Sequence, residues 1–211
     1  MSAKARKALA ASDPTMAALI ERVGKIDLAT RLKRRSEERP DDAYGALLRA
    51  IVGQQLSTKA ARTIYLRVLD IFGGQTPSPE QLLAAGEADL RGAGLSGRKV
   101  EYIQDLARHV LSGELELDRL GELDDETVIE ELVAVRGLGR WTAEMFLIFH
   151  LERPDVISGG DLGIRKAVQV EYGLEEMPAP LRVVEISEPW SPYRSLASLY
   201  LWESLAAVPG G

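Results

Sequence analysis

Cysteine is absent from this chain of 211 residues, and histidine occurs only twice. The lack of cysteine excludes disulfides, thiolate zinc sites and a cysteine-ligated iron–sulfur cluster. Two histidines that lie far apart in the sequence also do not suggest a His-based catalytic metal site. We therefore expect no metal cofactor for chemistry.

Long apolar runs are missing as well. No stretch of about 18 consecutive apolar residues occurs, and residues 1–7 lack the apolar run and cleavage site of a signal peptide. The length suits one compact unit or two small domains, and 45% apolar residues are enough for a buried core. We expect a soluble protein of the cytoplasm, or of the nucleus in a eukaryote, that is neither secreted nor membrane-bound.

Positive charge is in the minority, since 26 Lys and Arg stand against 32 Asp and Glu. A net charge of −6 argues against a protein that coats nucleic acid non-specifically, but it permits local contact. The first 39 residues are the exception, with ten basic and five acidic side chains and a basic cluster at 31–35. The simplest interpretation of that cluster is a solvated helix face, and a contact with nucleic acid stays open.

Convincing strand patterns of alternating apolar and polar residues are absent, whereas apolar residues at helical spacing are common. We therefore predict an all-α fold. Two helices are expected on either side of a break at 53–57. Further helices should follow an N-cap within 76–80, a glycine-rich turn at 90–99, and a cap at Asp124 or Asp125.

The most informative motif is Val-Arg-Gly-Leu-Gly-Arg-Trp-Thr-Ala at 135–143. Gly137 and Gly139 allow a sharp turn between two helices and a close approach of the backbone to a ligand. The N–H groups at the start of the helix from Arg140 can hold a phosphate without reading base sequence. Asp161 follows 18 residues later, after two glycines, which by itself is a common helix N-cap pattern.

Together with three further segments, this motif resembles the helix-hairpin-helix DNA glycosylases, in particular the 3-methyladenine DNA glycosylase II branch. The resemblance covers roughly residues 40 to 205, without the additional N-terminal β domain that some members carry. Its landmarks, in the order found in that branch, are Ile51–Ser57, the Gly94–Lys99 turn, the Gly137–Ala143 hairpin with Asp161, and Pro189–Ser195.

The resemblance implies two helical domains with the active-site cleft between them. We expect one domain at 43–153, carrying the hairpin, and a second formed by 1–42 and 154–211, with the crossing near Pro154. The implied partner is double-stranded DNA that contains alkylated bases. We expect a monomer, because a single damaged site imposes no two-fold symmetry. The implied reaction flips 3-methyladenine, 7-methylguanine or a related base out of the duplex and hydrolyses its N-glycosidic bond, leaving an abasic site.

The resemblance assigns catalysis to Asp161, whose carboxylate would stabilise an oxocarbenium-like sugar and orient or deprotonate the attacking water. Trp141 stands where strand-cleaving members carry a lysine, so a monofunctional enzyme without lyase activity is expected. The Trp141 indole would stack on a cationic alkylated base, with core packing as the alternative. Trp190 matches a second pocket aromatic, whereas Tyr193 and Trp202 are expected to support the core.

Gln55 matches the position that fills the gap left by the flipped base, and Leu56 is the competing candidate for this wedge. Gln54 is expected to be structural. We expect Gly137, Gly139, Arg140 and Thr142 to contact the DNA backbone, and Arg136, Arg98 and Lys99 could add positive charge. The hairpin of this family commonly holds a structural monovalent cation through backbone carbonyls, which no sequence pattern can establish.

Two other functions remain open. A non-catalytic DNA-binding module would use the hairpin only as a backbone clamp, but it would need neither Asp161 nor pocket tryptophans. A glycosylase for oxidised or mismatched bases would keep the chemistry and change the substrate. Trp141 in the lysine position and the absence of cluster cysteines count against the members that cleave strands or carry iron–sulfur clusters.

Overall fold

The computed structural model describes residues 3–26 and 42–206 of the protein. Within these ranges every regular element is a helix, which confirms the predicted all-α fold. No helix of the described chain is both long enough and apolar enough to cross a membrane. The basic cluster at 31–35 lies outside the described residues.

The chain divides into two compact units. Unit 1 consists of Met1–Arg34 and Leu147–Gly211, and unit 2 consists of Arg35–Phe146. The limits predicted from the sequence lie after residues 42 and 153. Helix α10 runs past residue 146, and its last residue, Phe149, stacks on Trp202 of unit 1 with 5.7 Å between ring centroids.

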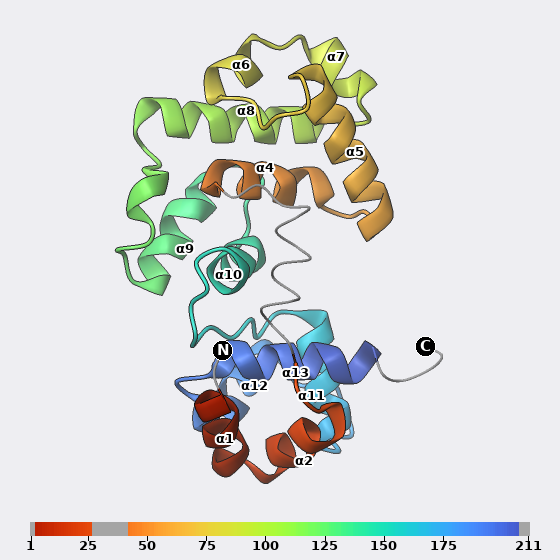
Figure 1. Ribbon diagram of the computed structural model, residues 1–211, viewed down its shortest axis with the longest axis vertical. Coiled ribbons are helices and arrows are strands. Elements are labelled where there is room, and N and C mark those ends of the chain that lie inside the picture. The colour runs from red at the N-terminus through yellow and green to blue at the C-terminus, as the bar shows by residue number, and fades with distance from the viewer. Residues whose placement is uncertain (1–2, 27–41, 207–211) are drawn as a thin grey trace. The chain divides into compact units, whose positions relative to one another are not determined.

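Unit 2 is built from helices (Figure 1), several of which begin at side-chain caps. The side chains of Ser57, Ser78, Ser96 and Asp124 each accept a backbone N–H of the first turn that follows, and each such cap contributes about 1 kcal/mol. The elements are α4 (Ala43–Gly53), α5 (Thr58–Ile71), α6 (Pro79–Ala84), α7 (Glu87–Gly92), α8 (Gly97–Ser112), the 3-10 helix η1 (Leu117–Arg119), α9 (Asp125–Ala134) and α10 (Arg140–Phe149).

Helices α4 and α8 form the centre of unit 2. Leu48 and Val52 of α4 and Ile103 and Leu106 of α8 are fully buried, and α8 packs against both α4 and α6 (Figure 1). Each buried aliphatic side chain of this size contributes about 1.5–3 kcal/mol to folding. Helix α8 is therefore firmly held, and it can support the loops that lie beside it.

Unit 1 joins the two ends of the chain. The middle of helix α13 is buried, with Tyr200 and Leu201 in the core, because α1, α2 and α11 all pack against the helix. This packing brings the start of α11, which follows Asp161, next to α13. The elements are α1 (Ala3–Ser12), α2 (Pro14–Val23), α11 (Leu162–Glu171), α12 (Pro180–Ile186), the 3-10 helix η2 (Glu188–Trp190) and α13 (Arg194–Ala206).

Candidate functional site

Asp161 is the N-cap of α11 and is half-buried. Its Oδ1 atom accepts the backbone N–H of Ile164 at 2.8 Å and the indole N–H of Trp202 at 2.9 Å. The predicted cap is thus confirmed, and it places the carboxylate at the positive end of the helix dipole. Two donors on one oxygen hold the carboxylate in a defined orientation, as a group that acts on a substrate requires. Its catalytic role stays a prediction.

Two glycines near Asp161 lie so close to neighbouring atoms that a side chain would not fit easily at either position. A Cβ atom at Gly159 would lie 2.6 Å from the backbone oxygen of Pro180, so only glycine can pass α12 there. A Cβ atom at Gly163 would lie 3.0 Å from Oδ1 of Asp161 and 3.1 Å from the Trp202 ring. Replacement of Gly163 would therefore press on the carboxylate and its tryptophan partner, and replacement of Gly159 would press on α12.

Trp202 is the aromatic residue that the structure places beside Asp161, and the sequence had suggested only core support for it. Its ring is half-buried and stacks on Phe149 with an interplanar angle of 26°. Its distance from Asp161 in sequence is 41 residues, so no local motif could show this contact. The only available sequence signal is the unusual aromatic content of the last helix.

The prediction that Trp190 is a second aromatic of the base pocket is wrong, because the side chain is buried in the core. The side chain is 0% exposed, and its indole N–H donates to Oδ2 of Asp13 at 3.1 Å. Tyr172 lies at a ring distance of 6.3 Å and donates its hydroxyl to the same oxygen at 2.6 Å. Because the ring is enclosed by the core of unit 1, it offers no face to a base. Trp190 is a core residue that anchors the N-terminal helices.

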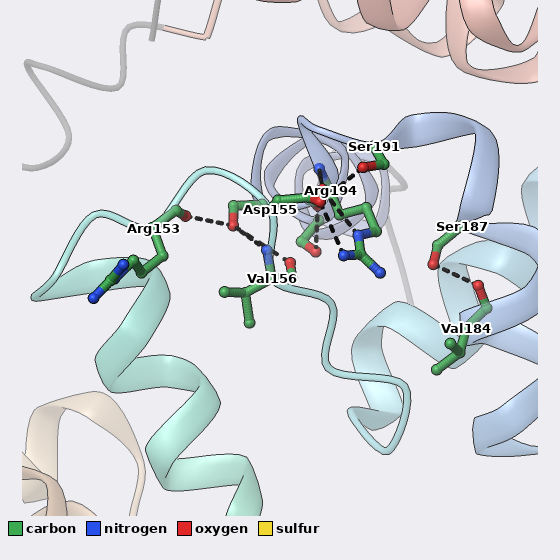
Figure 2. Close-up of polar contacts among 9 residues, drawn as sticks. Arg153, Asp155, Val156, Val184, Ser187, Ser191 and Arg194 are labelled. Atoms are coloured by element: carbon green, nitrogen blue, oxygen red, sulfur yellow. Dashed lines mark hydrogen bonds and ion pairs between the residues drawn. The ribbon is translucent and has the colours of Figure 1, made fainter. Parts of the chain in front are cut away.

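The segment that leads from α10 to Asp161 is tied to the start of α13, as Figure 2 shows. The carboxylate of Asp155 accepts two bonds from the Arg194 guanidinium, at 2.8 and 2.9 Å, and one from the Ser191 hydroxyl at 2.8 Å. Burial acts to raise the pKa of Asp155, but these hydrogen bonds outweigh it and hold the pKa below its usual value. The buried Ser195 hydroxyl also donates to the carbonyl of Arg153 at 2.7 Å.

The predicted hairpin lies in unit 2, between α9 and α10. Its turn is closed by the N–H of Leu138, which donates to the carbonyl of Val135 at 3.1 Å. Gly137 has φ +89°, and a Cβ atom there would overlap the Tyr102 ring. Glycine is therefore required at 137 by both the backbone and the packing. Gly139 has no such constraint, because nothing lies within 4 Å of a Cβ atom at that position.

Trp141 lies in the first turn of α10 and is 51% exposed, which excludes the alternative of core packing. An exposed ring of this size can stack on a planar ligand. Thr142, in contrast, is only 8% exposed, so its hydroxyl is poorly placed for the predicted contact with DNA. Trp141 and Thr142 differ in exposure because consecutive residues of an α-helix point about 100° apart around its axis.

Arg140 is engaged by two carboxylates. Its guanidinium forms a two-point contact with Glu126, at 2.7 and 2.8 Å, and its Nε donates to Glu144 at 3.1 Å. The hydrogen bond from Arg140 also lowers the pKa of Glu126. A phosphate contact by Arg140 would require an exchange of partners, so the predicted role in DNA binding stays a prediction that these ion pairs oppose.

The loop between α4 and α5 carries both wedge candidates. Gln55 is exposed and has φ +58°, a left-handed conformation that costs about 1–3 kcal/mol for a residue with a side chain. Leu56 is 36% exposed. Both side chains are at the surface, and the choice between them stays open on exposure alone. The left-handed backbone at Gln55 therefore requires neighbouring contacts that hold it in place.

Lys99 lies at the predicted turn, in the first turn of α8, but its ammonium is bound to backbone carbonyls. Its ammonium donates to the carbonyls of Val52 and Gln54, at 2.7 and 2.8 Å, at the end of α4. Partial burial lowers the pKa of Lys99. Gln54 has the structural role that was expected, since its amide donates to the carbonyl of Gly137 at 2.7 Å. Arg136 is exposed and pairs with Glu101 at 3.3 Å.

A metal site made of side chains is not found in the described ranges, where no group of three or more His, Cys, Asp or Glu residues comes together. A monovalent cation at the hairpin would instead use backbone carbonyls. The carbonyl oxygens of Val135 and Gly137 each accept one hydrogen bond and keep a second lone pair. These carbonyl oxygens are suitable ligands for a monovalent cation, and the binding of the cation stays a prediction.

These features define a helical protein with a glycine-containing hairpin between two helices of one unit and an oriented carboxylate in the other. Residues 48–192 match the model of the HhH-GPD superfamily of base excision DNA repair proteins, and the chain belongs to this family. DNA-3-methyladenine glycosylase 1 of Schizosaccharomyces pombe is 35% identical over 203 residues, which cover 95% of this chain and 86% of that protein.

The solved structure of an S. pombe 3-methyladenine DNA glycosylase in complex with abasic DNA matches with a TM-score of 0.81 and 32% identity, and the match covers 99% of each chain. A Bacillus subtilis relative, YfjP, is 35% identical over 168 residues, which are 77% of this chain. The chain spans 58% of the length of YfjP, so the relatives differ in what they carry beyond the shared region.

Proposed function

We propose that this protein is a monofunctional DNA glycosylase that removes alkylated bases, such as 3-methyladenine and 7-methylguanine, from double-stranded DNA. The observation that carries the proposal is the carboxylate of Asp161, oriented by the N-terminus of α11 and by the Trp202 indole. Relatives that are named as 3-methyladenine glycosylases and match over nearly the whole chain support the substrate class.

The chemistry follows from a carboxylate beside a sugar. As the N-glycosidic bond breaks, its electron pair leaves with the base and the sugar becomes positively charged at the anomeric carbon. The negative charge of Asp161 would stabilise this cation and orient the water that adds to it. The water loses one proton, and the products are free base and an abasic site. A methylated purine already carries positive charge, so its departure needs no strong general acid.

The remaining residues would bind the DNA. The hairpin backbone from Gly137 to Arg140 would hold a phosphate, and Gln55 would fill the space left by the extruded base. Trp141 offers an exposed ring for stacking, and Trp202 replaces Trp190 as the aromatic beside the carboxylate. Indole cannot form a Schiff base with the sugar, so Trp141 in the lysine position supports hydrolysis without strand cleavage. We expect the enzyme to act as a monomer on cellular DNA.

The Asp161→Asn substitution tests this proposal. The asparagine amide oxygen can still accept the two hydrogen bonds, so the fold should persist while the negative charge is lost. We expect base release from methylated duplex DNA to fall at least about 100-fold, the scale of one well-placed electrostatic group. The assay measures released base, and strand breaks with and without alkali.

The parent protein should produce strand breaks only after alkali treatment. Breaks without alkali would contradict the monofunctional assignment. If parent and variant bound the DNA equally and neither released any alkylated base, the protein would be a DNA-binding module that uses the hairpin as a clamp. Release of oxidised or mismatched bases in place of alkylated ones would change the substrate class.

A further inference from the structure

Two side chains on one face of helix α8 contact the hairpin and hold it in place. The ring of Tyr102 packs directly beneath Gly137. Three residues further along, Oδ2 of Asp105 accepts the backbone N–H of Arg136 at 2.9 Å. Asp105 is buried, and its partner is the residue that precedes the turn. These two contacts fix the position of the hairpin relative to α8.

The same face of α8 also holds the wedge loop, which we define as Gln54–Leu56. Lys99 lies three residues before Tyr102, and its ammonium binds the carbonyls of Val52 and Gln54. These carbonyls lie at the C-terminus of α4, where helical partners are missing and a positive charge is favourable. An ammonium has three donors, and two of them are used here to fix the chain just before Gln55.

Gln54 links the two supported segments to each other. Its backbone carbonyl accepts from Lys99, and its side-chain amide donates to the carbonyl of Gly137, the residue that sits on Tyr102. Gln55 follows immediately, in its left-handed conformation. Such a conformation persists only where neighbouring contacts enforce it, and Gln54 supplies contacts through both its backbone and its side chain.

We propose that Lys99 and Gln54 are positioning residues for insertion into the duplex: they hold Gln55 in its left-handed conformation and set its distance from the hairpin. The inference rests on the proposed function, since a base that is flipped leaves a gap to be filled. The hairpin would bind one phosphate group of the DNA. The distance between the hairpin and the wedge loop would then decide whether Gln55 reaches the gap. Neither Lys99 nor Gln54 needs to contact DNA in this role.

The experiment uses duplex DNA that contains an uncleavable abasic analogue with 2-aminopurine beside it. A side chain that enters the gap unstacks the 2-aminopurine and raises its fluorescence. We expect Lys99→Met to reduce this signal and the single-turnover rate of base release about 10- to 100-fold, the effect of a misplacement of about 1 Å. Lys99→Arg, which keeps the positive charge and can donate to both carbonyls, should restore most of both. Lys7→Met, at an exposed position of α1, controls for the loss of one positive charge.

A double-variant cycle with Gln55→Ala separates positioning from general damage. If Lys99 acts through Gln55, the double variant should lose no more signal than Gln55→Ala alone. Losses that multiply would overturn the inference, as would parent-like fluorescence in Lys99→Met. If Lys99→Met lacks the helical circular dichroism of the parent, Gln54→Leu takes its place in the same cycle, with the same expectations.

The fluorescence readout needs no bond cleavage, so the inference and the proposed function can fail separately. A parent protein that inserts a side chain but releases no base would contradict the glycosylase assignment and support the positioning role, provided Lys99→Met abolishes insertion. A parent protein that releases alkylated base and binds the abasic duplex without any fluorescence rise would support the glycosylase assignment and overturn the positioning role.

Discussion

Two tryptophans of unit 1 each donate their indole N–H to a carboxylate, and the two carboxylates differ in burial. Trp202 donates to Asp161 at the start of α11, whereas Trp190 donates to Asp13 in the core. The first carboxylate is half-buried and the second is buried. The same chemical group therefore supports a candidate reaction in one place and the fold in the other, and the two roles can be separated by a matched pair of substitutions.

Trp202→Phe keeps a ring against Phe149 and removes only the donor to Asp161. We expect base release to fall about 10- to 100-fold, because the carboxylate loses part of its orientation. The stability of the protein should change by less than about 1 kcal/mol, because a half-buried site lets water replace the donor. Single-turnover base release and urea unfolding measure the two effects. An unchanged rate would remove Trp202 from the site.

Trp190→Phe is the matched change in the core. It leaves Oδ2 of the buried Asp13 with one donor fewer, which should cost about 1–3 kcal/mol of unfolding free energy. Base release per folded molecule should stay within about twofold of the parent, because the ring does not face a substrate. Urea unfolding and active-site titration measure this. A specific loss of activity at unchanged stability would restore Trp190 to the base pocket.

At the scale of the element, the two glycines of the hairpin differ in whether the fold requires glycine at their position. Gly137 is demanded by φ +89° and by the Tyr102 ring, whereas Gly139 is demanded by nothing in the described structure. Glycine at 139 is understandable if a ligand approaches the backbone there. We therefore expect Gly137 to serve the folding of the hairpin and Gly139 to serve the approach of a ligand.

Alanine at each position distinguishes these purposes. Gly137→Ala should lower the unfolding free energy by about 2 kcal/mol or more, since both the backbone and Tyr102 must shift. Gly139→Ala should change stability by less than about 0.5 kcal/mol but weaken DNA binding about tenfold, the effect of one lost contact to a charged group. Thermal unfolding and binding to an abasic duplex provide the comparison. Equal binding by Gly139→Ala and the parent would argue against a phosphate at the hairpin.

At the scale of the whole molecule, Asp13 connects the two ends of the chain. It caps α2, and its side chain accepts bonds from Tyr172 and Trp190, 159 and 177 residues away. Burial acts to raise the pKa of Asp13, but the hydrogen bonds from Tyr172, Trp190 and the backbone outweigh it, so the pKa lies below its usual value. A carboxylate with a lowered pKa stabilises the folded state through its ionised form.

The stability of the protein should therefore depend on pH through Asp13. Its contribution is complete above the pKa of the unfolded chain, about 3.9, and is lost as the pH falls through the lower pKa of the folded state. We expect Asp13→Asn to be destabilised by about 1–3 kcal/mol at neutral pH, with the difference from the parent shrinking below about pH 4. Urea unfolding at several pH values measures it. A difference that grows on acidification would contradict the assignment.

The local features of this protein were determined by the sequence itself. The all-α fold, the break between α4 and α5, the caps at Ser78 and Asp124, and the cap at Asp161 all depend on residues within a few positions of one another. Helical periodicity, capping and glycine turns act over one or two turns of chain, so the pattern of residue types is enough to predict them.

Only the tertiary structure decided which side chains meet. Trp202 reaches Asp161 and Lys99 reaches the end of α4 across 41 and 47 residues, and the burial of Trp190 depends on Asp13 at the other end of the chain. Aromatic and basic residues look alike in a sequence whether they face a ligand, a carboxylate or a carbonyl. Their roles are chosen by the packing of helices far apart in the chain, because that packing determines which donors find acceptors and which rings are excluded from water.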